Sequence, residues 1–205
     1  MKRYRLYAIG GMIAPIISLI AIALLGWLIE GYSHKSDMIS ELVAKGSQYA
    51  MPGTFIIILT GILLLLFVKG LYMKLPKNNY TKVFVALISF FAIFACIGSA
   101  AFPCEISDNK SLNCPTKTHE IINGLALGAL SLSPIMFILA TKGSAPWKNL
   151  TSVTYAAQIL GLIFLALFII YPDELTGLFQ RITLGIYFIW FEILAIRLYY
   201  IAKPT

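Results

Sequence analysis

The sequence predicts an all-α membrane protein: a polytopic helical bundle with six transmembrane helices and both termini in the cytoplasm. Three observations predict it. The 205 residues are 59% hydrophobic and 12% charged, the apolar residues lie in long blocks, and the basic residues gather on alternate connections. Soluble domains carry roughly 25% charged residues. The composition therefore indicates that lipid, and not water, surrounds most of the chain.

The apolar blocks give the spans in order. A hydrocarbon core of about 30 Å requires roughly 20 helical residues, and five uncharged blocks are long enough. A sixth block is interrupted only by Arg181, Glu192 and Arg197. The predicted spans of this single domain, 1–205, are about 7–29, 52–72, 83–102, 119–141, 152–172 and 180–201. Lipid cannot satisfy free backbone groups and the blocks lack the alternation of a barrel, so the spans are helices.

The first block follows Lys2, Arg3 and Arg5, as the core of a secretory signal would. It is longer than the 7–15 apolar residues typical of such a core, and no convincing cleavage pattern follows it. We interpret it as a retained first span.

The first external connection predicts a short amphipathic helix lying at the outer interface. Ser36 is placed to cap its start and Gly46 to end it, while Ile39, Leu42 and Val43 share one face.

The opposite face of this predicted helix is polar. At 100° per residue Asp37 and Glu41 lie on one side, with Ser40 beside them and His34 just before them. These residues are candidates for a site, although a solvated acidic face is the simpler interpretation.

The third span contains Cys96, interpreted as a small buried hydrophobic residue. After this span, Cys104 and Cys114 lie ten residues apart in a connection that the topology places outside the cytoplasm. An oxidising compartment favours a disulfide between them. Two thiolate metal ligands are the alternative, with His119 as the nearest third ligand.

His119 opens the fourth span, and Asn123 shares its helix face. The only other histidine, His34, is also predicted at the outer rim. Two histidines with nearby carboxylates can bind a divalent metal or serve as acid and base on a lipid headgroup. In the alternative, each histidine only forms an interfacial hydrogen bond. Further along this span, Gly124 and Gly128 predict close helix packing.

Two charged residues mark the last span. The planar fork of Arg181 suits a phosphate or carboxylate, and an ion pair with Asp173 or Glu174 is the alternative. Glu192 lies eleven residues further on, roughly 16 Å deeper in the membrane. An intramembrane carboxyl there is a proton carrier or coupling-ion ligand, or a protonated glutamate bonded to a neighbouring span.

The charges orient the bundle. The predicted side that holds both termini carries 11 of the 16 basic residues, and the other side carries eight of the nine acids. The positive-inside bias therefore places both ends in the cytoplasm, in a bacterial or archaeal cytoplasmic membrane. The net charge of +7 is spread along loop edges, where it suits anionic lipid and not nucleic acid.

The segment order resembles DUF 998, a family of small six-helix membrane proteins of unknown function. The resemblance rests on Gly31-Tyr32-Ser33, Ile39-Ser40-Glu41-Leu42, Phe102-Pro103, His119 and Gly177-Leu178-Phe179-Gln180-Arg181. The chain departs from the pattern where Cys104-Glu105 replaces an early aspartate and where Glu120 replaces a threonine. More distantly it resembles the DRAM and Sfk groups, which implies lipid handling.

These features together predict an external polar site that binds a membrane-lipid headgroup, with hydrolysis or transfer of that headgroup as the catalytic form of this prediction. The catalytic candidates are His119, Asp37 and Glu41, and the binding candidates are Arg181, Ser40, His34 and Asn123. No cofactor is predicted beyond a divalent metal as an alternative. The alternative functions are a small-solute or ion transporter with Glu192 as coupling carboxyl, and a non-catalytic scaffold.

Overall fold

The computed structural model describes residues 2–106, 112–113, 118–171 and 174–201. Six helical segments in it are long and apolar enough to cross a membrane, which confirms the all-α, six-span prediction. The elements are α1 (Lys2–Leu28), α2 (Ala50–Lys74), α3 (Asn79–Phe91), α4 (Ser99–Ala101), β1 (Glu105–Ile106), β2 (Leu112–Asn113), α5 (Thr118–Thr141), α6 (Thr151–Ile170) and α7 (Thr176–Ile201). A π-helix, Ala92–Gly98, joins α3 to α4 within one span.

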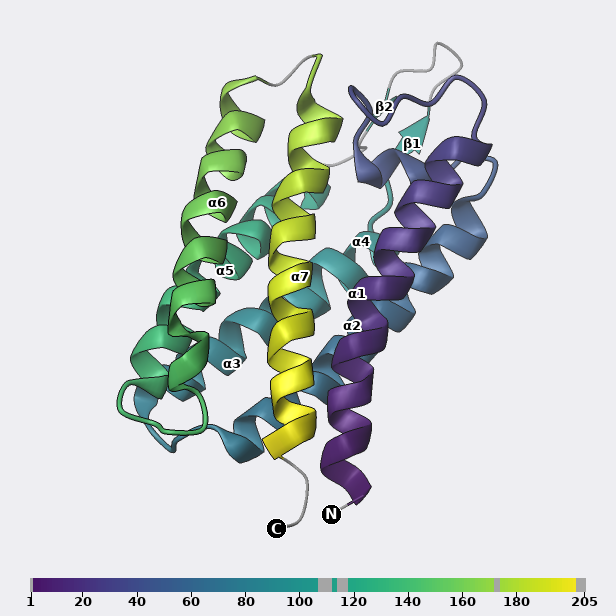
Figure 1. Ribbon diagram of the computed structural model, residues 1–205. Helices are drawn as coiled ribbons and strands as arrows, with labels where there is room; N and C mark the ends of the chain where they lie inside the picture. Colours follow the sequence, from purple (N-terminus) through teal and green to yellow (C-terminus); the bar gives the residue numbers. More distant parts are fainter. Residues whose placement is uncertain (1, 107–111, 114–117, 172–173, 202–205) are drawn as a thin grey trace.

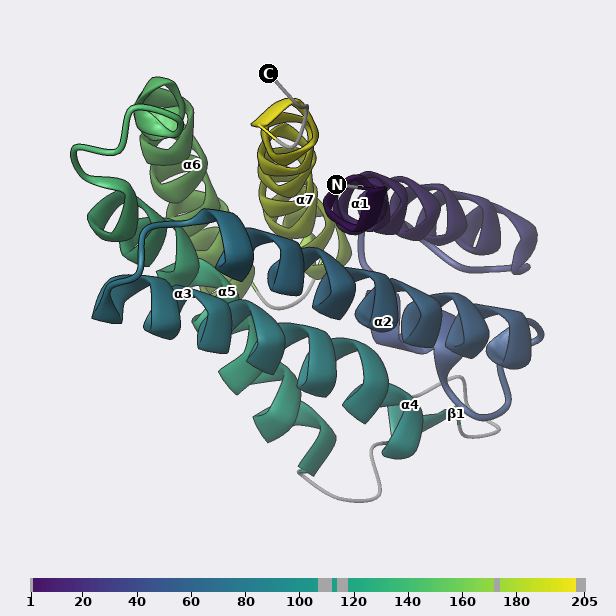
Figure 2. The same ribbon diagram turned by 90° about the horizontal axis from the view of Figure 1, so that it is seen from below.

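The helices pack largely with their neighbours in sequence. α1 packs against α2 and α7, α3 against α5, and α6 against α7, which places α7 between α1 and α6 (Figure 1). The view along the bundle shows α2 and α3 side by side, with α6, α7 and α1 in a row on the side of α2 (Figure 2). Both chain ends lie at one end of the bundle (Figure 1). We call the opposite end the outer end; its exposure outside the cytoplasm stays a prediction.

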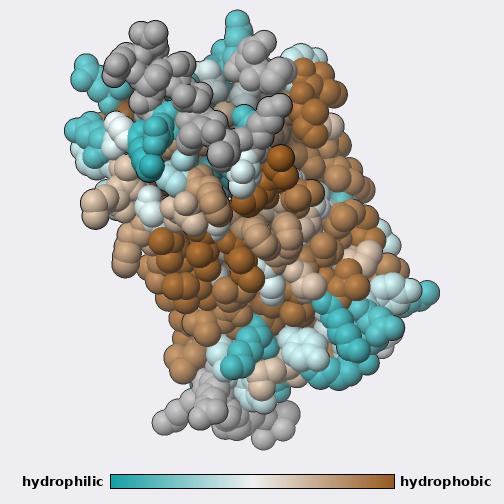
Figure 3. All heavy atoms as spheres, turned by 180° about the vertical axis from the view of Figure 1, so that it is seen from behind, coloured by the Kyte–Doolittle hydropathy of each residue, from teal (hydrophilic) through white to brown (hydrophobic). Residues whose placement is uncertain are grey.

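The surface has the pattern expected for a protein in lipid. On the face seen in Figure 3, hydrophobic side chains cover the middle, and hydrophilic side chains gather toward both ends. Many large apolar side chains point outward, among them Trp27, Phe55 and Ile169. Because a soluble monomer rarely exposes so large an apolar surface, this belt supports placement in a membrane.

Aromatic rings fill the half of the core nearer the termini. Phe137 packs edge to face against Trp147 and Trp190, with ring centroids 5.8 and 5.9 Å apart. Trp147 is in the connection between α5 and α6, and it is fully buried. Its Nε1 donates a hydrogen bond to the carbonyl of Lys74, 3.3 Å away, so this connection is tied to the end of α2.

The predicted interfacial helix is shorter and tighter than expected. It is a 3₁₀-helix, Ile39–Val43, that begins after Met38 and not after Ser36. The Oε1 of Glu41 accepts the backbone N–H of Met38 at 2.8 Å, so Glu41 and not Ser36 caps the start of this helix. The predicted apolar face is confirmed, because Ile39, Leu42 and Val43 are buried against Leu25 of α1.

The small residues pack elsewhere than predicted. A Cβ added at Gly124 or Gly128 of α5 would meet nothing within 4 Å, so the predicted close packing there is wrong. The close approach is instead at Gly61 of α2, where an added Cβ would lie 2.9 Å from the Cβ of Cys96. Cys96 is a free, buried member of the main core, as predicted.

Candidate functional site

Arg181 holds the first outer connection onto the start of α7. Its Nη1 donates to the carbonyl oxygens of His34, Asp37 and Gly177, at 3.1, 2.8 and 2.8 Å. Its Nη2 donates to the hydroxyl of Tyr32, whose ring also lies beneath the guanidinium, 5.4 Å from centroid to Cζ. The guanidinium therefore bonds chiefly to backbone oxygens of the loop and to a neutral hydroxyl.

The same loop satisfies the first backbone donors of α7. The N–H groups of Gly177 and Leu178 donate to the carbonyls of Ser36 and Lys35, at 3.2 and 3.0 Å. These groups have no partner within a helix, so the loop takes the place of a capping side chain. The contact requires Gly177, because a Cβ there would lie 2.3 Å from the carbonyl oxygen of Asp37.

Beneath this loop, a cavity of about 330 Å³ lies between α1 and α7. Its lining residues are Leu19, Ile22 and Ala23 of α1, Leu178, Arg181 and Leu184 of α7, and His34 and Ile39 of the loop. Six of these eight are apolar, and no carboxylate is among them. The site therefore combines an apolar channel between helices with a cationic group at its outer end.

The polar groups of the cavity differ in charge. Arg181 has a buried Nε with no hydrogen-bond partner among the described residues. Burial lowers the pKa of His34, and the charge of Arg181 lowers it further. His34 is therefore neutral near neutral pH and leaves Arg181 as the cation of the cavity.

The packing of His34 depends on a second glycine. A Cβ at Gly26 of α1 would lie 2.4 Å from the Cε1 of His34, so only glycine lets the ring approach the helix this closely. Tyr32 packs edge to face against the same ring, with centroids 5.5 Å apart. Burial raises the pKa of Tyr32, which therefore stays a neutral hydrogen-bonding group.

The two predicted loop carboxylates stabilise the loop itself. Asp37 accepts the backbone N–H of Ser33 at 2.8 Å and the hydroxyl of Ser36 at 2.7 Å. Glu41 accepts the N–H of Met38, and its pKa is raised chiefly by burial. Neither of them lines the cavity, and neither does Ser40.

His119 belongs to a separate cluster where α5 meets the third span. Its Nδ1 lies 2.8 Å from the carbonyl oxygen of Phe102, a hydrogen bond when that nitrogen carries the proton. Asn123 donates to the carbonyl of His119 and accepts the hydroxyl of Ser99, both at 2.9 Å. Within the described ranges, no hydrogen bond, ring contact or cavity joins His119 to His34.

Among the described residues, the loops that carry the two clusters contact each other at Lys45. The N–H of Lys45 donates to the carbonyl of Cys104 at 2.8 Å, and its Nζ forms an exposed ion pair with Glu105 at 2.9 Å. Cys104 is buried, while Cys114 lies outside the described residues, so the disulfide stays a prediction. Asp173, a predicted alternative partner of Arg181, also lies outside them.

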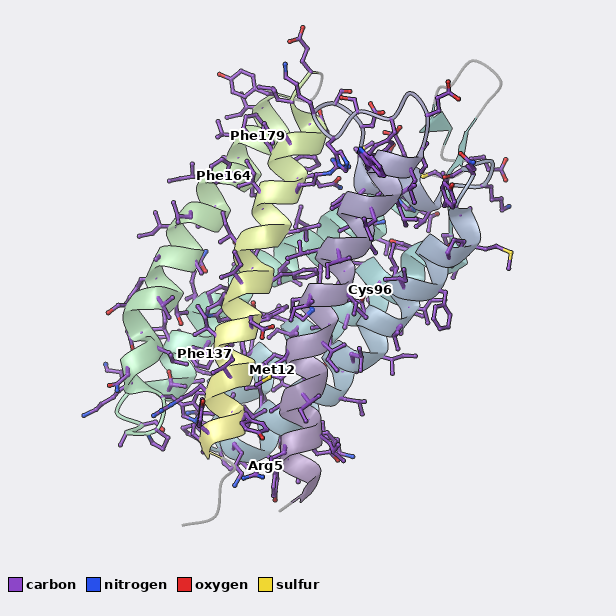
Figure 4. All side chains as sticks on the ribbon, turned by 45° about the vertical axis from the view of Figure 1, so that its right-hand side comes forward. Arg5, Met12, Cys96, Phe137, Phe164 and Phe179 are labelled. Atoms are coloured by element: carbon purple, nitrogen blue, oxygen red, sulfur yellow. The ribbon has the colours of Figure 1, made fainter. Side chains whose placement is uncertain are left out.

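Glu192 lies deep within the last span. The helix places it on nearly the same face of α7 as Arg181, because eleven residues return to within about 20°. Tyr199 lies on the same face, seven residues beyond Glu192, and its ring lies 5.3 Å from the Cζ of Arg5 of α1 (Figure 4). This face of α7 therefore runs along the interface with α1. The Oε2 of Glu192 is buried and has no hydrogen-bond partner among the described residues.

No group of three or more histidines, cysteines, aspartates or glutamates is close enough to hold a metal in the part of the chain that the structure describes. A metal site therefore finds no support in this geometry.

Sequence reasoning missed Tyr32, Gln180 and the apolar residues of α1. The Oε1 of Gln180 accepts the N–H of Ile39 at 2.8 Å, and so fixes the start of the 3₁₀-helix. Tyr32 and Gln180 both stand within the short motifs of the resemblance, which is a usable signal. No sequence signal marked Leu19 and Ile22 as cavity residues, because apolar residues occur throughout every span.

No curated protein and no solved structure matches the chain. A family model described as "Protein of unknown function (DUF998)" matches residues 12–197, which include both the loop that Arg181 holds and the cluster around His119. The chain is therefore a member of the DUF998 family, as its motifs predicted, and by its six candidate spans a multi-pass membrane protein.

Proposed function

We propose that this protein binds an anionic membrane lipid, with its headgroup at Arg181 and the upper part of its chain between α1 and α7. The observation that carries the proposal is the apolar cavity lined by Arg181, whose buried Nε–H has no hydrogen-bond partner among the described residues. A buried donor without a partner costs free energy that a ligand atom can recover.

The charges of the lining favour an anion. Arg181 is cationic, His34 is held neutral by its lowered pKa, and no acid lines the cavity. A phosphate or carboxylate oxygen at the Arg181 guanidinium would form a charge-assisted hydrogen bond, which is stronger than one between neutral groups. A zwitterionic headgroup would place its positive part beside Arg181 and bind less well.

The position of the cavity favours a lipid over a solute from water. His34 and Ile39 cover it on the outer side, whereas Ala23 and Leu178 at its edge are exposed toward the membrane belt. Arg181 lies five residues into α7, about 8 Å below the helix start. A headgroup can reach that depth, and its chain can enter laterally between the two helices.

Catalysis stays a separate prediction. Hydrolysis or transfer of the headgroup would need His119 near the cavity, and the described contacts of His119 are with Phe102 and Asn123. Transport also stays an alternative, supported by the unpartnered Oε2 of Glu192 further along α7. Flux into proteoliposomes that is lost with Glu192→Gln would favour the transport alternative.

A bulky residue in the cavity tests the binding proposal. Ala23→Trp fills the space between α1 and α7, while Leu24→Trp places the same ring on the neighbouring, 53% exposed position. We expect native mass spectrometry from phosphatidylglycerol nanodiscs to show lipid retained by the Leu24→Trp protein. We expect roughly tenfold less with Ala23→Trp, about 1.4 kcal/mol of binding free energy.

The charge of the ligand is tested with matched nanodiscs. Phosphatidylglycerol should be retained in preference to phosphatidylcholine, and Arg181→Gln should abolish the preference. Equal retention of the two lipids, or full retention after Ala23→Trp, would show that the cavity is not an anionic-lipid site.

A further inference from the structure

A second set of polar atoms, unpartnered among the described residues, lies deep between α6 and α7, less than two helical turns along α7 from Arg181. Gln158 of α6 is 6% exposed, and Tyr187 of α7 is fully buried. The Oε1 and Nε2 of Gln158 and the hydroxyl of Tyr187 have no hydrogen-bond partner among the described residues. Both residues stand near the middle of their spans, where the hydrocarbon core is expected.

Neighbouring contacts place the two side chains at one level of the interface. A Cβ added at Gly161, about one turn from Gln158 on α6, would lie 2.3 Å from the Tyr187 hydroxyl. One turn in the other direction, the hydroxyl of Thr154 accepts the Nε1–H of Trp190 at 3.1 Å. Gln158 therefore lies on the α6 face that contacts α7, between two contacts with α7 residues.

The surrounding elements offer few other partners. Ser131 of α5 lies beside the Tyr187 hydroxyl, but it makes no hydrogen bond of normal geometry to it. Its own hydroxyl donates to the carbonyl of Leu127 at 2.8 Å. On the outer side, Phe164 and Phe179 close the α6–α7 interface with ring centroids 6.2 Å apart (Figure 4).

Leaving these groups unsatisfied in hydrocarbon would cost several kcal/mol for each. A direct hydrogen bond between Gln158 and Tyr187 would satisfy at most one end of the amide and leave the other. A water molecule can donate to Oε1, accept from Nε2 and bond to the phenol together, within the two to four polar partners typical of buried waters. We propose that Gln158 and Tyr187 form an intramembrane water-binding site between α6 and α7.

Radiolytic hydroxyl labelling tests this site, because radicals formed from a bound water oxidise the side chains that touch it. The protein would be irradiated in nanodiscs and mapped by mass spectrometry. Trp190 is the internal control, because it is also an aromatic residue that hydroxyl radicals oxidise and it is only 1% exposed. Its Nε1–H already has a partner, the hydroxyl of Thr154. We expect Tyr187 to be labelled several-fold faster than Trp190. Equal protection of Tyr187 and Trp190 would overturn the proposal.

Gln158→Leu tests the role of the amide while the helix is kept. We expect labelling of Tyr187 to fall several-fold and labelling of the buried Trp190 to stay low, which shows that the bundle is intact. Labelling of Tyr187 that does not change in this variant would also overturn the proposal, because the amide would then not hold the water.

Discussion

At the scale of single residues, Arg181 combines two tasks. Its Nη atoms donate to loop carbonyls and the Tyr32 hydroxyl, while its Nε is buried without a partner among the described residues. His34 lies against the same cation, and this proximity together with burial makes its protonation unfavourable. The outer site therefore tolerates one positive charge, and a second would disturb it.

His34 makes the loop sensitive to acid. The pKa of His34 in the folded loop is below the ordinary value of 6.5. Protonation of His34 therefore favours conformations in which the loop has moved away from Arg181. The contribution of neutral His34 is complete above about pH 6.5 and is lost as the pH falls below that value. We expect amide hydrogen exchange of residues 32–38, corrected for the intrinsic rate, to increase between pH 7 and pH 5.

His34→Gln is the matched variant, because glutamine keeps a polar side chain that does not titrate. The acid response of the loop should be much smaller in this protein. Glu41 acts in the opposite direction, since its raised pKa means that protonation favours the folded loop as the pH falls. An unchanged response in His34→Gln would mean that another group controls the loop.

At the scale of elements, the start of α7 depends on the loop between α1 and α2. Loop carbonyls take the first N–H groups of α7, Gln180 caps the 3₁₀-helix, and Gly177 permits the approach. Two segments about 140 residues apart in sequence thus complete each other's hydrogen bonds. This mutual dependence gives the site a fixed geometry.

A pair of glycine substitutions in α7 separates close contact from helix propensity. Gly177→Ala would push the loop away and should cost about 1–3 kcal/mol, as overpacking typically does. Gly185→Ala, with nothing within 4 Å of the added Cβ, should stabilise by about 0.5–1 kcal/mol. Thermal unfolding midpoints in detergent should therefore move in opposite directions. A shift in the same direction for both would contradict the tight contact at Gly177.

The β1–β2 hairpin supports the predicted disulfide. Its antiparallel register pairs Glu105 with Asn113, so the chain leaves and returns at the same place beside Cys104. A disulfide across this turn would stabilise by about 2–4 kcal/mol on the chain-entropy model.

Peptide mapping checks the disulfide. Trypsin cleavage after Lys110 separates Cys104 from Cys114 in sequence, so the two peptides should stay linked until a reductant is added. Alkylation of both cysteines without reductant would contradict the prediction. Cys96, which is free and buried, should be alkylated only after denaturation.

At the scale of the whole molecule, the apolar belt and the two polar ends define how the bundle sits in a membrane (Figure 3). The termini share one end and the Arg181 cavity is near the other (Figure 1). Which end of the bundle faces the cytoplasm is a prediction that rests on the charge distribution alone.

Cysteine labelling in intact cells checks the orientation. We expect a membrane-impermeant maleimide to label Gln48→Cys, in the first outer connection, and not Ala145→Cys, in the connection between α5 and α6. Both positions are exposed in the structure, so a difference reports sidedness and not burial. Labelling of Ala145→Cys alone would mean that the cavity opens toward the cytoplasmic leaflet.

The sequence by itself determined the all-α class, the six spans, the shared end of the termini and the family. These follow from block length, charge and motif order, which are local properties that lipid enforces on every span. Arg181 was also found from sequence, because a charge near the membrane is rare enough to stand out.

Only the tertiary structure decided which polar residues meet. His34 and Arg181 share a cavity because Gly26 and Gly177 allow close approach between distant segments, whereas His119 bonds within its own cluster. The cavity wall of Leu19, Ile22 and Leu184 was equally hidden, since in a membrane protein apolar residues face lipid and core alike. Hydropathy therefore predicts which segments cross the membrane, while helix packing decides which of their faces enclose a site.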